Sequence, residues 1–272
     1  MRTKLIAWGL AGALIAAMAP AVFAQSQPAD EPFAWPLEQW RALTPEVDPE
    51  TPGPQKPPAA RVVRKGLRAS GAVALTFDDG YNGRACGRIA NILRKHDAVG
   101  TFFVNGRYLQ DQPGRWRQTL EGMEVGNHTR SHRDLTREVH PVVERQIAQN
   151  EAIHEQVLDR PMLKVLRPPY GAYGERVGRI AKQLGYDRVV MWNVDTGDWR
   201  PNVKAKSIAR RATGAPAGSI ILMHCARDAT VKALPKIIRH YERRGIKLAG
   251  LKKVLKGTKG SRRSDGSSRY DQ

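Results

Sequence analysis

The stretch Leu75-Thr76-Phe77-Asp78-Asp79-Gly80 decides how the rest of this chain is interpreted. It closes an apolar run that begins at Val73, and such a run ending in polar residues is typical of a buried strand that leads into a loop. The glycine allows the sharp turn that such a loop needs. Adjacent carboxylates repel each other and lose hydration at a strand end, so the pair indicates a cation or a shared proton that offsets this cost. A solvated turn is the alternative interpretation.

The first 24 residues predict a secretory signal peptide. Met1 to Lys4 is basic, Leu5 to Ala21 is apolar and uncharged, and Val22-Phe23-Ala24 forms a small-residue cleavage pattern. An uncleaved membrane anchor is the alternative, although the apolar run is at the short limit for spanning a bilayer. We therefore expect a secreted or periplasmic protein that is cut after Ala24.

Composition divides the remaining chain into three parts. Residues 25–60 hold nine prolines around an aromatic stretch, Phe33 to Trp40, and predict a Pro-rich linker or N-terminal extension without a regular core element. Residues 61–255 have the composition of one folded domain. Residues 256–272 are rich in Gly, Ser, Lys and Arg, and predict a basic disordered tail.

The chain carries a formal net charge of +19, and removing Arg2 and Lys4 with the signal peptide lowers it to +17. So basic a body and tail favour an anionic cell-wall polymer or a membrane surface as a partner. A nucleic acid partner is not expected, because an exported protein seldom meets one and no nucleic-acid-binding motif is recognisable. Charge that only aids solubility is the alternative.

The chain has two cysteines, Cys86 and Cys225, which is too few for a disulfide framework or a cysteine-based metal site. Whether the two form a single disulfide is left open by the sequence, because their separation in space is unknown.

Strand and helix patterns alternate through the folded domain. Strands are expected near residues 72–77, 100–104, 123–127, 163–167, 186–192, 218–223 and 246–249. Helices are expected near residues 83–95, 114–121, 138–158, 175–184, 204–213 and 230–244. Repeated strand–helix units imply a parallel sheet, and continuous apolar runs suit strands that are buried on both faces. Seven strands without a nucleotide-binding fingerprint favour an α/β barrel closed by helices.

A second polar cluster follows the third expected strand and contains His128 and His132. Their spacing places both imidazoles on one face of a helical turn, about 6 Å apart along its axis. That is close enough to share one ion, and imidazole with carboxylate suits zinc, nickel, copper or iron. Two solvated histidines on a helix surface are the alternative, but the nearby Asp-Asp strand end favours a metal site.

Further chemically capable residues also follow expected strands. Arg167 to Gly171 follows the fourth strand, Asp195 to Trp199 follows the fifth, and His224 closes the sixth. The carboxyl ends of all strands in a strand–helix barrel meet on one face, where active sites are built. Five of the seven expected strands place such residues at this end, which predicts one site there. Taken singly, each residue has a structural alternative: an ion pair, a packing residue or a buried histidine.

Together these motifs resemble the polysaccharide deacetylases, the NodB-homology domain of carbohydrate esterase family 4. The five motifs of that family occur in order from Thr76 to His224, and the resemblance covers roughly Gly71 to Leu251. It implies a distorted (β/α)7 barrel that forms a single catalytic domain over residues 61–255. It also implies a metal-dependent hydrolase that removes N-acetyl groups from a GlcNAc-containing polymer, such as peptidoglycan, a chitin oligomer or poly-GlcNAc.

The resemblance also implies catalytic roles for individual residues. Asp78 would be the base, and Arg167 would orient it. His224 would be the catalytic acid and would be paired with Asp198. The backbone N–H of Tyr170 would help to hold the oxyanion that forms during attack on the acetyl group.

Metal and substrate contacts follow from the same resemblance. Zinc, or another divalent transition metal, would be held by Asp79, His128 and His132. Trp199 and Leu222 would line the acetyl pocket, and Tyr170 would also contact the substrate.

The chain departs from the family at one position, because Cys225 stands where an aspartate often follows the motif histidine. This change is expected to alter the pocket wall more than the reaction, and it leaves a thiol near the metal open as a ligand or a site of oxidation. An O-acetyl, xylan-type esterase would share the same residues. A non-catalytic wall- or glycan-binding protein is a third alternative, which loss of Asp78 or His224 would favour; both are present.

Overall fold

The computed structural model describes residues 57–258, all of which fall within one compact unit. The predicted signal peptide and nearly all of the predicted linker and tail lie outside the described residues. Within the described part of the chain, no helix combines the length and the apolar character needed to cross a bilayer.

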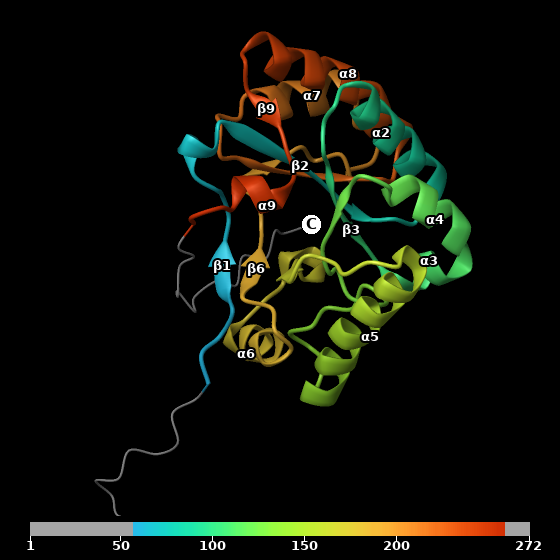
Figure 1. Cartoon of the computed structure of the whole chain (residues 1–272), viewed down its shortest axis with the longest axis vertical. Helices are drawn as coiled ribbons and strands as arrows, with labels where there is room; N and C mark the ends of the chain where they lie inside the picture. Colours follow the sequence, from blue (N-terminus) through green and yellow to red (C-terminus); the bar gives the residue numbers. More distant parts are fainter. Residues whose placement is uncertain (1–56, 259–272) are drawn as a thin grey trace, which may run out of the picture. The chain divides into compact units, whose positions relative to one another are not determined.

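Strands and helices alternate along these residues (Figure 1). The strands are β1 (Arg61–Val63), β2 (Ala72–Asp79), β3 (Thr101–Val104), β4 (Glu124–Val125), β5 (Val165–Leu166), β6 (Arg188–Val190), β7 (Val194–Asp195), β8 (Ile220–His224) and β9 (Lys247–Leu248). The helices are α2 (Gly83–Lys95), α3 (Gly106–Asp111), α4 (Pro113–Leu120), α5 (His140–Leu158), α6 (Glu175–Gln183), α7 (Ala205–Thr213), α8 (Asp228–Arg243) and α9 (Leu251–Val254). Short 3-10 turns occur at η1 (Arg68–Ser70) and η2 (Pro169–Gly171).

The named strands pair in parallel in two sheets that helices surround (Figure 1). One sheet has the order β4-β3-β2-β8-β7, with β9 also paired to β2, and the other has the order β1-β6-β5. A parallel bridge between Asn127 and Leu166 connects the end of β4 to β5 and so joins the sheets. This arrangement confirms the predicted α/β class and the distorted, barrel-like catalytic domain.

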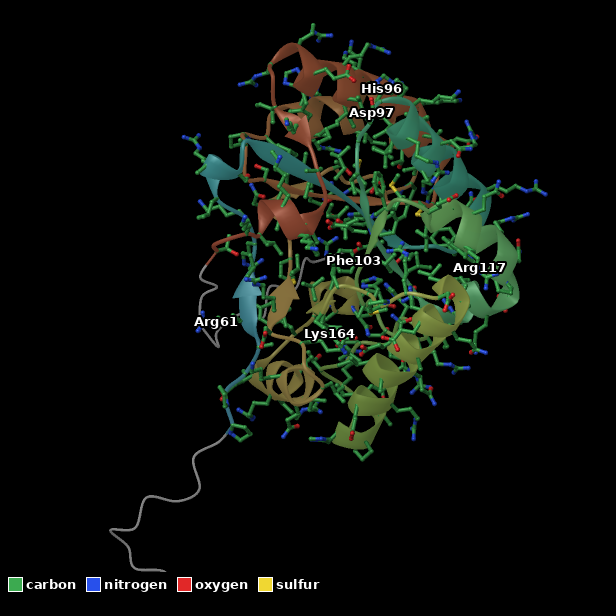
Figure 2. The ribbon with its side chains drawn as sticks, viewed as in Figure 1. Arg61, His96, Asp97, Phe103, Arg117 and Lys164 are labelled. Carbon is green, nitrogen blue, oxygen red and sulfur yellow. A yellow bond between two sulfur atoms is a disulfide. The ribbon has the colours of Figure 1, made fainter. Side chains whose placement is uncertain are left out.

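Strand β2 is the centre of the larger sheet and is buried from Ala72 to Asp78. Its Phe77 ring stacks on Phe102 of β3 with centroids 5.0 Å apart, and Phe103 lies in the interior, as Figure 2 shows. Burying one such side chain is worth about 1.5–3 kcal/mol. The apolar run therefore anchors the strand whose end carries the two carboxylates.

The turn after β2 depends on glycine. Gly80 has a φ of 90°, and a Cβ at this position would lie 2.5 Å from the Cγ1 atom of Val104. A side chain here would suffer both backbone strain and a clash. The preceding Asp79 also has a positive φ, of 75°, so the chain leaves the strand abruptly as the carboxylate reaches the sheet edge.

Each predicted strand and helix has a counterpart, but the prediction of a single strand over 186–192 is wrong in part. Strand β6 ends at Val190, and the chain then changes partners. The Met191 N–H donates to the Val63 carbonyl in one sheet, whereas the Asn193 N–H donates to the Ile220 carbonyl in the other. Apolar residues continue through this crossing, so the sequence pattern could not mark it. Asp195 consequently belongs to a separate strand, β7, and the prediction also omitted β1, α3 and α9.

Cys86 and Cys225 form a disulfide, with their Cα atoms 4.8 Å apart. It ties the first turn of α2 to the residue directly after His224. Successive side chains of an extended strand point to opposite sides, so Cys225 reaches α2 while His224 reaches the groove described below. The sulfur of Cys225 is bonded to that of Cys86, so the expectation of a free thiol near the metal is wrong.

Candidate active site

A groove of about 1490 Å³ opens at the carboxyl ends of the strands. Eight of the ten predicted site residues line it: Asp78, Asp79, His128, His132, Tyr170, Trp199, Leu222 and His224. The other two, Arg167 and Asp198, are buried behind the groove wall and contact residues that line it. Parallel pairing explains this convergence, because it brings the ends of β2, β5, β7 and β8 to one side of the sheets.

The predicted metal ligands lie together at the base of the groove. The Oδ1 atom of Asp79 lies 3.4 Å from Nε2 of His128 and 3.2 Å from Nε2 of His132. Ligands about 2.1 Å from a tetrahedral zinc ion are about 3.4 Å from one another, so these distances suit a shared ion. The same Oδ1 atom is buried without a hydrogen-bond partner among the described residues. The donor set and the unpaired oxygen therefore fit a divalent transition metal.

The charge of Asp79 supports the same conclusion. Burial alone would raise its pKa, but the close polar contacts with His128 and His132 and the positive charge of His128 and His224 outweigh burial and hold the pKa far below its usual range. The carboxylate is therefore ionised and can accept a cation. The two adjacent aspartates avoid repulsion by taking separate partners, because Asp78 pairs with Arg167 instead.

His128 and His132 come together because of the shape of an irregular loop, and not because they lie on one helical turn. Residues 126–132 form an irregular loop, in which Thr129 and His132 have positive φ angles of 67° and 60°. Positive φ is costly for residues other than glycine, about 1–3 kcal/mol each, and such strain often occurs at functional sites. The helical-turn prediction is wrong because buried hydrogen bonds from distant elements hold the loop out of a helical conformation.

Three buried asparagines supply much of that support. The Asn105 side chain donates to the carbonyls of His128, at 2.6 Å, and Thr129, at 3.1 Å. The Oδ1 atom of Asn127 accepts from the Thr129 N–H at 2.9 Å and from the Asn150 side chain at 3.0 Å. Asn150 comes from α5, 23 residues after Asn127, so no local sequence signal could have revealed this contact.

We expect Asn150→Leu to weaken zinc binding by about 10- to 100-fold, because outer residues that orient metal ligands typically contribute this much. The substitution removes one of the two hydrogen bonds that the Oδ1 atom of Asn127 accepts. Zinc affinity of the metal-free protein, measured against a chromophoric chelator, checks this result. Gln149→Leu on the exposed side of the same helix is the matched control. An unchanged affinity with a lowered melting temperature would assign Asn150 a purely structural role.

Asp78 is held by a fully buried guanidinium. The Nη1 atom of Arg167 donates to Oδ1 of Asp78 and to Oγ1 of Thr76, both at 2.8 Å. Burial lowers the pKa of Arg167, while the charge of Asp78 opposes that shift. The other oxygen of Asp78, Oδ2, lies 3.9 Å from Nε2 of His128 and so sits beside the metal ligands. Thr76 is a contributor to the site whose role the sequence did not reveal.

His224 forms a second polar pair across the groove. Its Nδ1 atom lies 2.8 Å from Oδ1 of Asp198, whose Oδ2 accepts from the His224 N–H at 2.8 Å and from the Thr230 hydroxyl at 2.7 Å. Burial alone would lower the pKa of His224, but the hydrogen bond and charge of Asp198, aided by Asp79 and Asp78, raise it to about 9. The imidazole is therefore protonated at neutral pH. Thr230, which fixes Asp198, was not predicted.

Tyr170 lines the groove with a side chain that is exposed rather than buried. Its φ is 60°, its ring packs edge-on against His132 with centroids 4.6 Å apart, and 60% of the residue is exposed. Within residues 57–258, no acceptor for the Tyr170 N–H is found. The N–H is thus a free donor in a residue that lines the groove.

Trp199 and Leu222 also line the groove. The Nε1 atom of Trp199 lies 3.5 Å from Oδ2 of Asp195, whose Oδ1 accepts from the Gly197 N–H at 2.7 Å. Asp195 therefore supports the tryptophan and is not paired with the predicted catalytic residues.

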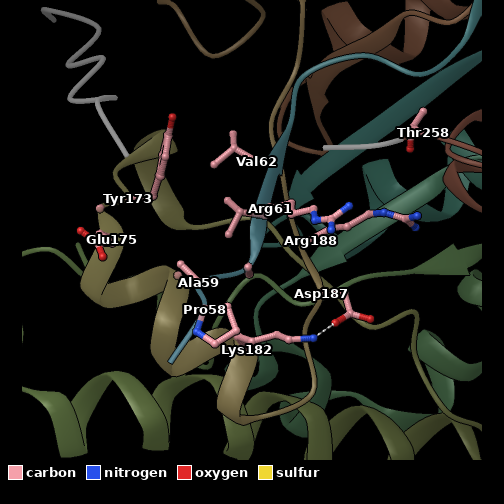
Figure 3. A pocket seen from close by; sticks show the side chains of 14 residues that line it. Pro58, Ala59, Arg61, Val62, Tyr173, Glu175, Lys182, Asp187, Arg188 and Thr258 are labelled. Carbon is pink, nitrogen blue, oxygen red and sulfur yellow. Dashed lines mark hydrogen bonds and ion pairs between the residues drawn. The ribbon is translucent and has the colours of Figure 1, made fainter. Parts of the chain in front are cut away.

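A second cavity, of about 730 Å³, lies beside β1, β6 and α6 (Figure 3). An ion pair between Lys182 and Asp187 lies at its edge, with Arg61 and Arg188 nearby. None of the predicted catalytic or metal-binding residues lines this cavity. The site chemistry is therefore confined to the groove.

The polysaccharide deacetylase family model matches residues 65–189. The chain is 34% identical to a chitooligosaccharide deacetylase of Azorhizobium caulinodans, over 61% of this chain and 77% of that protein. The chain belongs to the polysaccharide deacetylases of carbohydrate esterase family 4. A peptidoglycan-N-acetylglucosamine deacetylase of Bacillus cereus is 32% identical to this polysaccharide deacetylase, over 68% of this chain and 88% of that protein.

Solved structures agree with this membership. The crystal structure of the Bc1960 peptidoglycan N-acetylglucosamine deacetylase matches this polysaccharide deacetylase with a TM-score of 0.68 and 30% identity. The match covers 74% of this chain and 96% of that one. The family assignment made from the five motifs is therefore confirmed.

Proposed function

We propose that this protein is a metal-dependent hydrolase that removes N-acetyl groups from a GlcNAc-containing polymer such as peptidoglycan, a chitin oligomer or poly-GlcNAc. The observation that carries the proposal is the convergence of Asp79, His128 and His132 on one point, with the unpaired Asp79 oxygen among them. The Asp78–Arg167 pair and the His224–Asp198 pair adjoin this triad in the same groove.

When bound by the triad, zinc or a similar ion supplies Lewis acidity that acidifies water and polarises a carbonyl. Asp78 accepts a proton from the attacking water, because its carboxylate adjoins the triad and Arg167 fixes its orientation through Oδ1. The Tyr170 N–H donates to the oxyanion of the attacked acetyl group; one such donor is typically worth about 3–4 kcal/mol.

His224 delivers a proton to the departing amine. An amine leaves poorly unless it is protonated, so an amide substrate needs this acid more than an ester does. Asp198 keeps the His224 ring in place and protonated through the bond to Nδ1, which leaves Nε2 as the donor. Trp199 and Leu222 would form the wall against which the acetyl methyl group packs.

We expect Asp198→Asn to move the alkaline limb of the kcat profile by at least about one pH unit toward neutrality, because the substitution removes the charge that raises the pKa of His224. Activity needs protonated His224, so it should fall as pH rises through about 9 in the wild-type protein. The bound proton also contributes stability that is fully present below pH 6.5 and is lost through about pH 9. A pH–rate profile on an N-acetylated chitooligosaccharide measures the limb. Superimposable profiles for the two proteins would contradict the pairing.

Acetate release from peptidoglycan, chitooligosaccharides and acetylxylan tests the function as a whole. Release from one or more of the GlcNAc polymers should stop with a chelator and return with added zinc. Release from acetylxylan alone would favour the O-acetyl esterase, and no release from any polymer would favour a non-catalytic glycan-binding protein. We also propose that residues 1–24 direct the protein out of the cell and that zinc is its native ion.

A further inference from the structure

The positive charge of the protein is concentrated in the last third of the described chain. Residues 61–199 contain 22 lysines and arginines and 16 acidic residues. Residues 200–256 contain 15 lysines and arginines, against only Asp228 and Glu242. These residues build α7, β8, α8, β9 and α9, so the charge lies on one part of the domain rather than over its whole surface.

Helices α7 and α8 pack side by side and carry the densest part of this charge (Figure 1). Each buries an apolar face and exposes basic residues at helical spacing. The basic face consists of Lys206 and Arg210 on α7 and Lys232, Lys236, Arg239 and Arg243 on α8. The α8 row covers about three turns, roughly 16 Å. None of the six residues forms an ion pair within residues 57–258.

The two acidic residues of α8 do not neutralise this basic face. Asp228 pairs with Arg88 at 2.8 Å, and Glu242 pairs with Nδ1 of His96 at 2.8 Å; both partners are on or beside α2. Figure 2 labels His96, which lies at the end of α2 next to α8. On the same helix, burial and the positive charges of Arg244 and Arg243 lower the pKa of His240.

The shape of the basic face indicates the form of its partner. None of its six residues lines the groove or the second cavity, so the face is not a recess for a small anion. It also exposes no large apolar or aromatic side chain of α7 or α8. Rows on two neighbouring helices are about 8–10 Å apart. A planar layer of anionic groups can contact both rows, whereas a single linear polymer would follow one.

We propose that the basic face docks the protein onto the anionic headgroups of a phospholipid membrane. The attachment is electrostatic and reversible, because the face offers charge but no side chain that would insert among the acyl chains. Helix α8 begins shortly after His224, and none of the basic-face residues lines the groove, so docking leaves the groove open. A bound protein could therefore act on a polymer next to the membrane.

Co-sedimentation with vesicles of about 30% phosphatidylglycerol in phosphatidylcholine tests this proposal. Each basic residue near such a surface contributes about fivefold in affinity, so Lys236→Glu/Arg239→Glu should bind at least about 25-fold more weakly. The matched control is Arg115→Glu/Arg145→Glu, with one substitution on α4 and one on α5. It changes the net charge by the same amount as the test variant and should retain most of the vesicle binding. Raising the salt to about 0.3 M should release the wild-type protein, and phosphatidylcholine alone should not bind it.

Two results would overturn the proposal. Equal loss of binding in both double variants would show that net charge, and not the basic face, attracts the vesicle. Binding to soluble polyphosphate without co-sedimentation would assign the face to a dissolved polyanion. Melting temperature and acetate release from a soluble chitooligosaccharide should be unchanged in both variants, because none of the four residues lines the groove. Acetate release tests the proposed function separately from vesicle binding.

Discussion

Asp79→Asn is expected to lower zinc affinity by at least about 100-fold and kcat/KM by at least about 1000-fold, equivalent to roughly 4 kcal/mol of transition-state stabilisation. The substitution removes the only carboxylate of the triad and leaves two imidazoles. Asparagine has nearly the same shape and tolerates the positive φ of 75° at this position, so the fold should persist.

Zinc titration of the metal-free protein, together with acetate release, checks this expectation. Asp134→Asn is the matched control, because Asp134 lines the same groove outside the triad. Its side chain accepts hydrogen bonds from Thr136 instead. If Asp79→Asn bound zinc as tightly as the wild-type protein, the metal site would have to lie elsewhere.

His224→Ala is expected to lose about 100- to 10,000-fold in kcat on an N-acetylated sugar, the usual contribution of a general acid. On an activated aryl acetate the loss should be less than about tenfold, because a phenolate leaves without protonation. The Asp198 carboxylate keeps its bonds to the residue-224 N–H and to Thr230, so the wall of the groove should remain in place.

Comparing the two substrates in the same preparation separates the acid role from a general disturbance. Leu222→Ala is a useful reference, because Leu222 lines the groove but carries no proton. It should affect the amide and the ester to similar extents. Equal losses on both substrates in His224→Ala would remove the acid role and leave His224 as a structural residue.

Much of the fold could be predicted because a local run of apolar residues marks most of the strands. The run from Ala72 to Phe77 is apolar at every position except Thr76, and the structure buries all of it in a central strand. The crossing at Met191 was not predictable in the same way. Its residues are as apolar as those of the preceding strand, and only the identity of the hydrogen-bond partner changes.

The candidate site shows a similar division. The sequence alone determined which residues are chemically capable and that they follow strands, because acidic residues, histidines and Gly80 interrupt apolar runs at regular points. Tertiary structure decided how they are held. Asn150 reaches Asn127 from a distant helix, Arg167 is buried against Asp78, and Cys225 is bonded to Cys86. These contacts join segments far apart in the chain, and the conformation of the histidine loop depends on them rather than on its own residues.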